Sequence, residues 1–142
     1  MRISHRNAGF SMIELLVVMV ILGLLAGLVG PRLFDRADIA KVQTAETQMA
    51  MLKGSLTLFR LDIGRYPTAE EGLNALVRQP GNEKTWQGPY LDEAVPVDPW
   101  GNRYQYLYMR SGFQDFSLFS YGADGVKSGE GLNADIGFLP DT

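Results

Sequence analysis

The chain has 142 residues, the size of one small domain, with no cysteine, one histidine and a formal net charge of -3. The acidic balance disfavours a nucleic-acid-binding domain, because such domains carry basic patches. The missing cysteines exclude disulfides, thiol catalysis and cysteine-ligated zinc, and the single His5 leaves little for histidine-based catalysis, so the composition argues against an enzyme.

An apolar segment near the N-terminus is the first predicted element. Residues 15–29 are all apolar or glycine, and residues 10–30 add only one serine and Glu14 as polar positions. As a helix, this span would reach roughly 32 Å, close to the thickness of a bilayer core. Arg2 and Arg6 precede it, which favours an N-terminus on the cytoplasmic side. A removed secretory signal is the alternative, but no small-residue cleavage site follows the apolar residues.

Glu14 lies inside this predicted membrane helix. A lone carboxylate there costs about 3 kcal/mol on insertion scales, and it normally marks a partner or a function. No lysine or arginine follows within helical reach. If the chain were cut after Gly9, the new α-amine of Phe10 would supply a cation, in the same molecule or in a neighbouring copy. The alternative is a carboxylate that is simply solvated at the membrane interface.

Glycines mark two positions in and after the span. Gly23 and Gly27 form a G-x-x-x-G pair, which either allows close helix approach or reflects the glycine enrichment of membrane helices. Gly30 is followed by Pro31, which removes a backbone donor from a helix. This dipeptide predicts a kink or a locally unfolded stretch.

The helix is predicted to resume after Pro31 and to end near residue 62. Its apolar positions are spaced alternately by three and four residues, which places them on one face. They are Val42, Ala45, Met49, Leu52, Leu56 and Phe59. This stripe is typical of a helix packed on a sheet, and a groove for a cofactor or partner is the alternative.

The following region predicts short elements and loops. Thr68 and Glu71 have the spacing of a capping box for a helix over residues 69–78. Prolines break residues 86–100 into loops.

Two aromatic-rich strands are expected over residues 103–109 and 113–121, joined by a turn at residues 110–112. With the amphipathic helix they would form one α+β layer pair. The aromatic candidates for its core or rim are Trp100, Tyr104, Tyr106, Tyr108, Phe116 and Phe119.

The last part of the chain is rich in glycine and has few residues that can be buried. Asp124 and Asp135 are eleven residues apart, the separation of the first and twelfth positions of a calcium loop. Val126 at the third position and the lack of flanking helices exclude an EF-hand. Calcium ligation by oxygen atoms alone stays open, against a solvated acidic turn.

The leader and the membrane segment together resemble a known family. Residues 9–14 read Gly-Phe-Ser-Met-Ile-Glu ahead of the apolar run, which is similar to the prepilin-peptidase motif of type IV pilins and type II secretion pseudopilins. The resemblance implies cleavage after Gly9 and methylation of Phe10 as the new terminus. It also implies that Glu14 pairs with the N-terminal amine of an adjacent subunit during assembly.

Further motifs narrow the resemblance over essentially the whole chain. They read Gly-Arg-Tyr-Pro-Thr at 64–68, Glu-Gly-Leu at 71–73, Gly-Pro-Tyr-Leu at 88–91, Asp-Pro-Trp-Gly-Asn at 98–102, Gly-Ala-Asp-Gly at 122–125 and Ala-Asp-Ile-Gly at 134–137. Together they resemble the major pseudopilins of type II secretion systems, the protein G family of the general secretion pathway. That family binds calcium in the glycine-rich loop. The resemblance implies a Ca²⁺ site with the carboxylates of Asp124 and Asp135 and the backbone carbonyls of Tyr121, Val126 and Asn133.

The resemblance also implies the architecture. We expect an α+β, type IV pilin-like fold, in which a long N-terminal helix, half in the membrane and half amphipathic, packs on a small antiparallel sheet with a C-terminal calcium loop. Residues 1–9 would be the cleaved leader, 10–30 the transmembrane and assembly helix, and 31–142 a periplasmic domain. This domain would comprise a helix at 32–62, a variable loop region at 63–102, and the sheet and calcium loop at 103–142.

The implied function is structural and non-enzymatic. The chain would sit in the bacterial inner membrane with a cytoplasmic N-terminus and polymerise into a periplasmic pseudopilus that drives export of folded proteins across the outer membrane. Its expected partners are further copies of itself, minor pseudopilins, the prepilin peptidase and the inner-membrane assembly platform, with no nucleic acid. One alternative is a type IV pilin forming a surface fibre, although such pilins usually close their C-terminal region with a disulfide. Another is a membrane-tethered periplasmic hydrolase that uses two carboxylates, drawn from Asp92, Glu93, Asp98 and Asp115.

Overall fold

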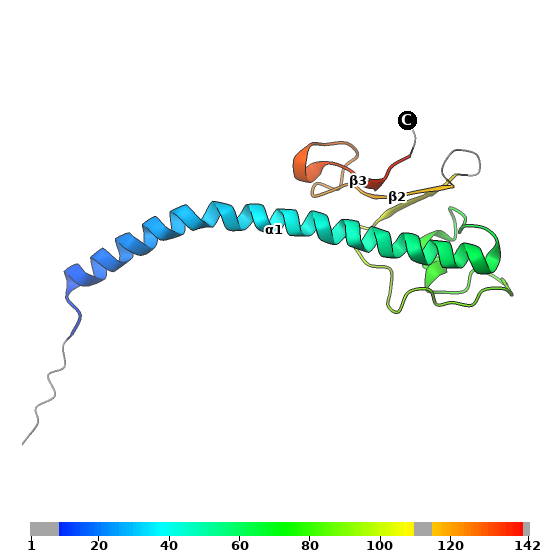
Figure 1. Ribbon diagram of the computed structural model, residues 1–142, viewed down its shortest axis with the longest axis horizontal. Helices are drawn as coiled ribbons and strands as arrows, with labels where there is room; N and C mark the ends of the chain where they lie inside the picture. Colours follow the sequence, from blue (N-terminus) through cyan, green and yellow to red (C-terminus); the bar gives the residue numbers. More distant parts are fainter. Residues whose placement is uncertain (1–8, 110–114, 141–142) are drawn as a thin grey trace, which may run out of the picture. The chain divides into compact units, whose positions relative to one another are not determined.

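The computed structural model describes residues 9–109 and 115–140, with residues 31–35 as backbone only. The chain divides into two compact units, Met1–Ala37 and Asp38–Thr142. The elements in chain order are helix α1 (Met12–Ile63), the 3-10 helix η1 (Gly72–Leu76), strands β1 (Gln105–Tyr108) and β2 (Phe116–Ser120), the 3-10 helix η2 (Gly131–Asn133) and strand β3 (Ile136–Phe138) (Figure 1).

Helix α1 continues through Gly30 and Pro31 without interruption. The prediction of a locally unfolded stretch at these residues is therefore wrong, and the kink stays a prediction. A proline inside a helix removes one hydrogen bond and costs about 3 kcal/mol. The helical turns on both sides keep their own bonds, so the helix does not have to end there. Its C-terminus at Ile63 agrees with the predicted end near residue 62.

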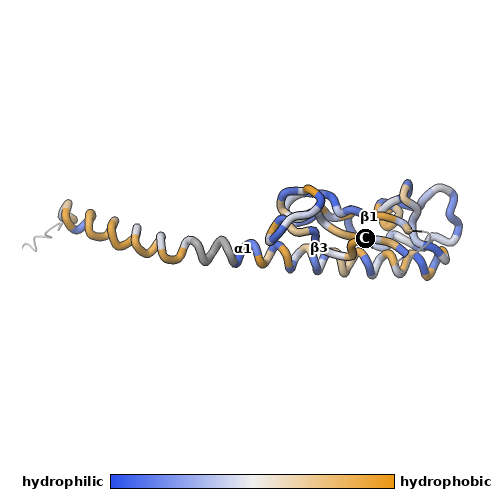
Figure 2. The backbone as a smooth tube through the Cα atoms, turned by 90° about the horizontal axis from the view of Figure 1, so that it is seen from above, coloured by the Kyte–Doolittle hydropathy of each residue, from blue (hydrophilic) through white to orange (hydrophobic). Residues whose placement is uncertain are grey.

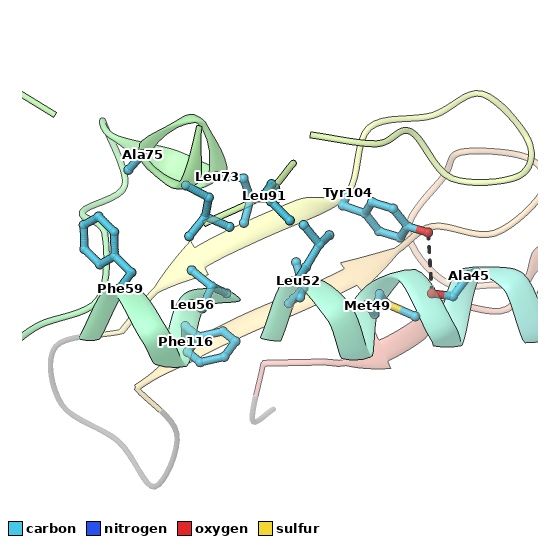
Figure 3. Close-up of a cluster of buried hydrophobic side chains, with 12 residues drawn as sticks. Ala45, Met49, Leu52, Leu56, Phe59, Leu73, Ala75, Leu91, Tyr104 and Phe116 are labelled. Carbon is cyan, nitrogen blue, oxygen red and sulfur yellow. Dashed lines mark hydrogen bonds between the residues drawn. The ribbon is translucent and has the colours of Figure 1, made fainter. Parts of the chain in front are cut away.

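The apolar stripe in the second half of α1 forms the centre of the core, as its spacing predicts. Five of its six members are at most 2% exposed: Ala45, Met49, Leu52, Leu56 and Phe59. Val42, the first member, is only partly buried. Figure 3 shows Leu73, Leu91 and Tyr104 among the side chains that pack onto this face of the helix. Full burial of each large apolar side chain contributes about 1.5–3 kcal/mol, so this stripe contributes substantially to the domain's stability.

A three-stranded antiparallel sheet in the order β1-β2-β3 lies against the second half of α1 (Figure 1). Leu118 in the central strand is opposite Tyr106 on one side and Phe138 on the other, and it is fully buried in the core together with Phe116. Both predicted strands are confirmed, in shorter form, whereas the predicted turn at residues 110–112 lies outside the described residues. The third strand was not predicted.

The aromatic candidates divide between core and rim. Tyr104, Phe116 and Phe119 are at most 9% exposed, while Trp100 and Tyr106 are partly buried against the core. Tyr108 is also partly buried. The six therefore lie in the core or at its rim, as expected.

The capping box is present, but the helix behind it is not the one predicted. The backbone N–H of Thr68 donates to Glu71 Oε2 at 2.8 Å, and the N–H of Glu71 donates to Thr68 Oγ1 at 3.3 Å. Gly72 has a φ of 56°, a left-handed conformation that ends a right-handed helix. Only the short η1 follows, so the predicted helix over residues 69–78 is wrong in type and length.

Polar and aromatic contacts attach the loop region to α1. The hydroxyl of Tyr90 donates to Asp62 at 2.8 Å, and its ring packs edge-to-face on Phe59 with the centroids 5.7 Å apart. The hydroxyl of Ser55 donates to the carbonyl of Tyr90 at 2.9 Å. Residues 86–100 contain no helix and no extended strand, as the prolines predict, and these contacts order them instead.

Candidate functional site

The first half of α1 presents apolar side chains on every face. Met12–Gly30 is a 19-residue segment that is long and apolar enough to cross a membrane, and its apolar stretch is visible as the first part of the tube in Figure 2. The exposed fractions of its large apolar side chains run from 47% at Val18 to 88% at Met12. A helix that is apolar all round is stable only when lipid or protein covers it. The described residues of the unit Met1–Ala37 provide no such cover.

Glu14 is the one charged side chain in this segment. It lies exposed in the first turn of α1 and forms no ion pair with any other described residue. Gly9 and Phe10 precede the helix, and Phe10 is 80% exposed. A peptide bond outside regular structure is accessible to a peptidase. The three processing and assembly residues of the sequence analysis thus lie together at the N-terminal end of α1, while the rest of the predicted leader, residues 1–8, lies outside the described residues.

The C-terminal loop connects β2 to β3, so the sheet holds its two ends together. Ser120 pairs with Ile136 at the end of the ladder, and the N–H of Ala123 donates to the carbonyl of Leu132 at 2.9 Å. The next residues outward from the ladder are Tyr121 and Asp135. The limb that carries Asp124 and the limb that carries Asp135 are therefore tied to each other.

The carboxylates of this loop accept hydrogen bonds from backbone amides. Asp124 Oδ1 accepts from the N–H of Val126 at 3.0 Å. Both oxygens of Asp135 accept from the N–H of Ser128, at 3.2 and 3.1 Å. Ser128 has a φ of 70°, the one positive φ among the described residues other than glycine. The loop thus folds back on its own carboxylates in a tight conformation.

A cation bound by this loop would meet oxygen donors. No three histidine, cysteine or carboxylate side chains converge within the described residues, so such a cation would depend on two carboxylates and on backbone carbonyls. Between described residues, no hydrogen bond reaches the carbonyl oxygens of Tyr121, Val126 or Asn133. Carboxylates with uncommitted carbonyls are the donors that Ca²⁺ prefers. The donor chemistry of the residues that the sequence analysis selected therefore fits calcium.

The carboxylates that could serve a hydrolase have structural partners instead. Asp98 is 3% exposed, and both of its oxygens accept hydrogen bonds. Asp115 pairs with Arg60 on the surface at 3.0 Å. Asp92 and Glu93 are exposed in an irregular segment. The carboxylates of Asp98 and Asp115 are thus both occupied by hydrogen bonds or an ion pair, which argues against a role as catalytic acid or base.

Sequence comparison relates the chain to a known family along nearly its entire length. A family model described as "Type II secretion system (T2SS), protein G" matches residues 32–138, and one described as "Prokaryotic N-terminal methylation motif" matches residues 4–30. The chain belongs to the type II secretion system protein G family. The resemblance seen in the sequence motifs is thereby confirmed.

Individual members of the protein G family are similar over the whole chain. The Type II secretion system core protein G of Pseudomonas aeruginosa is 44% identical over 136 residues, covering 94% of this chain and 95% of that protein. The corresponding protein of Vibrio cholerae is 41% identical, covering 96% and 94%. The crystal structure of the major pseudopilin from the type 2 secretion system of enterohaemorrhagic Escherichia coli matches with a TM-score of 0.58 and 37% identity, covering 75% of this chain and 93% of that chain.

These findings decide between the functional alternatives. The chain is a membrane-anchored pseudopilin of the type II secretion system and a structural subunit of its pseudopilus. The hydrolase alternative is wrong, because the family is structural and not enzymatic. The surface-fibre alternative gives way to the secretion pseudopilus.

Sequence reasoning missed a group of polar residues at the base of the C-terminal loop. Asp98, Asn102 and Ser120 contact one another and the loop. Asp98 and Asn102 belong to the Asp-Pro-Trp-Gly-Asn motif. In the sequence analysis this motif contributes to the resemblance and Asp98 is a candidate hydrolase carboxylate, but neither inference connects these residues to the loop. A carboxylate and an amide four residues apart around a Pro-Trp-Gly turn were the available signal.

Proposed function

We propose that this pseudopilin is inserted in the bacterial inner membrane with a cytoplasmic N-terminus and a periplasmic domain, and that it polymerises to drive export of folded proteins across the outer membrane. The observation that carries the proposal is the first half of α1, which is apolar on all faces over Met12–Gly30 and is left uncovered by the other described residues of its unit. Lipid covers this surface before assembly. Helices of other copies cover it in the polymer, where close packing replaces lipid contacts.

Glu14 and the processed N-terminus provide the register between copies. Cleavage after Gly9 converts the amide nitrogen of Phe10 into an amine, which keeps its positive charge when it is methylated. A carboxylate among apolar helices is unfavourable without a partner. The amine of a neighbouring copy offsets this cost, and it does so at one axial position only. The pair therefore selects a single stagger between adjacent helices.

Insertion, cleavage after Gly9 and polymerisation each require a partner protein. The prepilin peptidase would act on the bond between Gly9 and Phe10, which lies outside the helix. An inner-membrane assembly platform would extract the subunit from lipid, and minor pseudopilins would share the filament. Each of these contacts would involve the N-terminal half of α1, whose apolar side chains over Met12–Gly30 are exposed.

The C-terminal loop would bind Ca²⁺ through the carboxylates of Asp124 and Asp135, with the carbonyls of Tyr121, Val126 and Asn133 as further donors. The bound ion supplies positive charge to a loop in which acidic side chains outnumber lysine. The charged side chains of this loop are Asp124, Lys127, Glu130 and Asp135. Because the loop buries few apolar atoms, the ion would stabilise an arrangement that the loop's own packing holds weakly.

The Glu14→Gln substitution tests the assembly role. We expect a variant that is cleaved, methylated at Phe10 and inserted in the membrane, but that forms no filament and exports no substrate. Mass spectrometry of the mature N-terminus and electron microscopy of overproducing cells measure these outcomes. Glu46→Gln, at an exposed position of the same helix, is the matched control and should assemble normally. Normal secretion by Glu14→Gln would refute the register role.

The Asp124→Ala substitution tests the calcium site. The melting temperature of the wild-type protein should rise when Ca²⁺ is added and fall with chelator, because a ligand of the folded state stabilises it. In Asp124→Ala this dependence should disappear. Glu130→Ala removes the same charge from an exposed position in the same loop and should keep it. A wild-type melting curve that ignores both calcium and chelator would exclude the site.

A further inference from the structure

A group of three polar side chains joins the turn at residues 98–102 to the start of the C-terminal loop. We call Asp98, Asn102 and Ser120 the clasp. Asp98 Oδ2 accepts a hydrogen bond from the hydroxyl of Ser120 at 2.5 Å. Asp98 Oδ1 accepts from the backbone N–H of Asn102 at 2.7 Å and of Trp100 at 3.1 Å. The carboxylate thus connects its own turn to the last residue of β2.

Because Asp98 is buried, its carboxylate depends on these hydrogen bonds. The residue is 3% exposed, and within the described part of the chain no cation pairs with it. A buried carboxylate without a cation is unfavourable unless hydrogen bonds satisfy its oxygens. Here two backbone amides and one hydroxyl satisfy them. The carboxylate cannot leave this position without losing all three donors.

The clasp holds Gly122, the second residue of the loop, by both of its polar backbone groups. The hydroxyl oxygen of Ser120 accepts from the N–H of Gly122 at 3.1 Å, and Asn102 Nδ2 donates to the carbonyl of Gly122 at 3.3 Å. Gly122 has a φ of 71°, and a Cβ there would lie 2.7 Å from the carbonyl oxygens of Leu132 and Ala134. The residue that the clasp holds is therefore also the point where the two limbs of the loop meet.

Asn102 also lies against the turn that carries Asp124. A Cβ at Gly125 would come within 3.2 Å of Asn102 Oδ1, so the amide side chain is in close contact with this turn. The turn at residues 98–102 is closed by its own backbone bonds, from Asp98 N to Asn102 O at 2.8 Å and from Gly101 N to Asp98 O at 2.9 Å. The side-chain amide of Asn102 is not needed to close it. Its hydrogen bond goes to the loop.

We propose that the clasp residues Asp98, Asn102 and Ser120 are positioning residues for calcium, which fix the limb of residues 121–126 before the ion binds. The inference rests on the proposed calcium site. With the limb already ordered, Asp124 and the carbonyls of Tyr121 and Val126 need little rearrangement. Without the clasp, the cost of ordering the limb is subtracted from the binding free energy. Partners that orient metal ligands typically contribute in this way.

The test uses Asn102→Ala and Ser120→Ala in the full-length protein purified in detergent, titrated with Ca²⁺ alone. We expect the calcium affinity to fall about tenfold in each variant, as for other residues that orient metal ligands. In chelator, the backbone amide of Ala123 should exchange its hydrogen faster than in the wild type. Ser55→Ala is the matched control, since Ser55 is also a buried serine but donates to Tyr90 and Met51, outside the loop. It should lower the melting temperature without changing the calcium affinity.

The results separate failure of the clasp from failure of the calcium site. If the wild type binds Ca²⁺ and both clasp variants bind it equally well, the clasp proposal is overturned and the calcium site stands. If affinity falls in Ser55→Ala as much as in the clasp variants, the effect is one of general stability, which also overturns the clasp. If the wild type itself binds no Ca²⁺, the calcium site falls, and the positioning role falls with it.

Discussion

The two halves of α1 are one continuous helix, yet they depend on different surroundings. In the second half, apolar residues recur every three or four positions, and the side chains of Leu52, Leu56 and Phe59 are completely buried in their own domain. In the first half, over Met12–Gly30, apolar residues occupy every face and none of the large ones is buried. The periodicity of the second half thus places its apolar side chains on one face, which packs against the rest of its own domain. The absence of periodicity in the first half requires partners on all sides.

This difference indicates where the protein's stability and its assembly reside. The second half is stabilised within the chain by the sheet and the loop region, so its energetics can be measured in a single molecule. Under the proposed function, the first half is stabilised by what surrounds it, first by lipid and then by other copies. A substitution in the first half should therefore leave the stability of the domain unchanged, and a substitution that destabilises the second half should not alter the surface used for assembly.

A pair of identical substitutions tests this separation, with the largest expected effect. Leu56→Ala removes a fully buried side chain and should lower the free energy of unfolding of the domain by about 3 kcal/mol. Leu24→Ala, at a position that is 71% exposed in the first half, should change it by less than about 0.5 kcal/mol. Denaturant titration followed by tryptophan fluorescence measures both, because the only tryptophans, Trp86 and Trp100, lie in the second unit. Equal losses in the two variants would contradict the separation.

The same contrast explains which parts of the fold could be predicted from the sequence. The membrane segment is a long, continuous apolar run and the one-face stripe is a long periodic pattern, and both kinds of pattern indicate from the sequence which side chains need to be covered. Strand β3 is three residues long with a glycine at its centre, so it offers no alternation to detect. The predicted helix over residues 69–78 failed because the left-handed φ of Gly72 is a backbone property that composition alone does not reveal.

The candidate site divides in the same way. Gly9, Phe10 and Glu14 lie within six consecutive residues of the chain, so a linear motif identified them. Asp98 and Ser120 are separated by 22 positions, and only the folded sheet brings them together. A contact of that kind depends on where the turn at residues 98–102 lies against the end of β2, and the linear spacing of the two residues does not reveal this.

Removing the hydroxyl of Tyr104, which lies at the end of the buried stripe, should lower the stability of the domain by a smaller amount. This hydroxyl donates to Gln48 Oε1 at 2.6 Å and lies 3.5 Å from the carbonyl of Ala45 (Figure 3). Burial, with the charge of Asp98 as a second cause, raises the pKa of Tyr104 to about 12. Tyr104→Phe should lower the free energy of unfolding at neutral pH by about 1 kcal/mol, because Gln48 loses its donor.

The pH dependence of the Tyr104 variant gives an independent check. A phenol whose pKa is raised by folding stabilises the folded state below its ordinary pKa of 10.0 and loses that contribution as the pH rises towards about 12. The difference between the wild type and Tyr104→Phe should therefore shrink above pH 10.0. Tyr108→Phe, at a partly buried rim position, is the control and should show a smaller loss at neutral pH. An undiminished difference at alkaline pH would contradict this account.

The smallest expected effect concerns the capping box that follows α1. Lowering the pH should weaken this contact in the second unit and leave the first half of α1 unaffected. Arg65 makes two hydrogen bonds to the carboxylate of Glu71, at 2.7 and 2.9 Å, and these bonds lower the pKa of Glu71 below its ordinary 4.5, with the backbone N–H of Thr68 adding to the shift. A carboxyl whose pKa is lowered by folding stabilises the folded state above its ordinary pKa, and this contribution is lost as the pH falls through the lowered value.

Glu71→Gln should therefore lower the free energy of unfolding by roughly 0.5 kcal/mol at neutral pH, since the pair is partly solvated. The difference from the wild type should vanish in acid. Tryptophan fluorescence would report this loss in the second unit, while Met12–Gly30, which contains no member of the pair, should keep its helical circular dichroism in detergent. A Glu71→Gln variant whose deficit is the same in acid as at neutral pH would show that the charge of Glu71 contributes nothing, and that its side chain acts through shape alone.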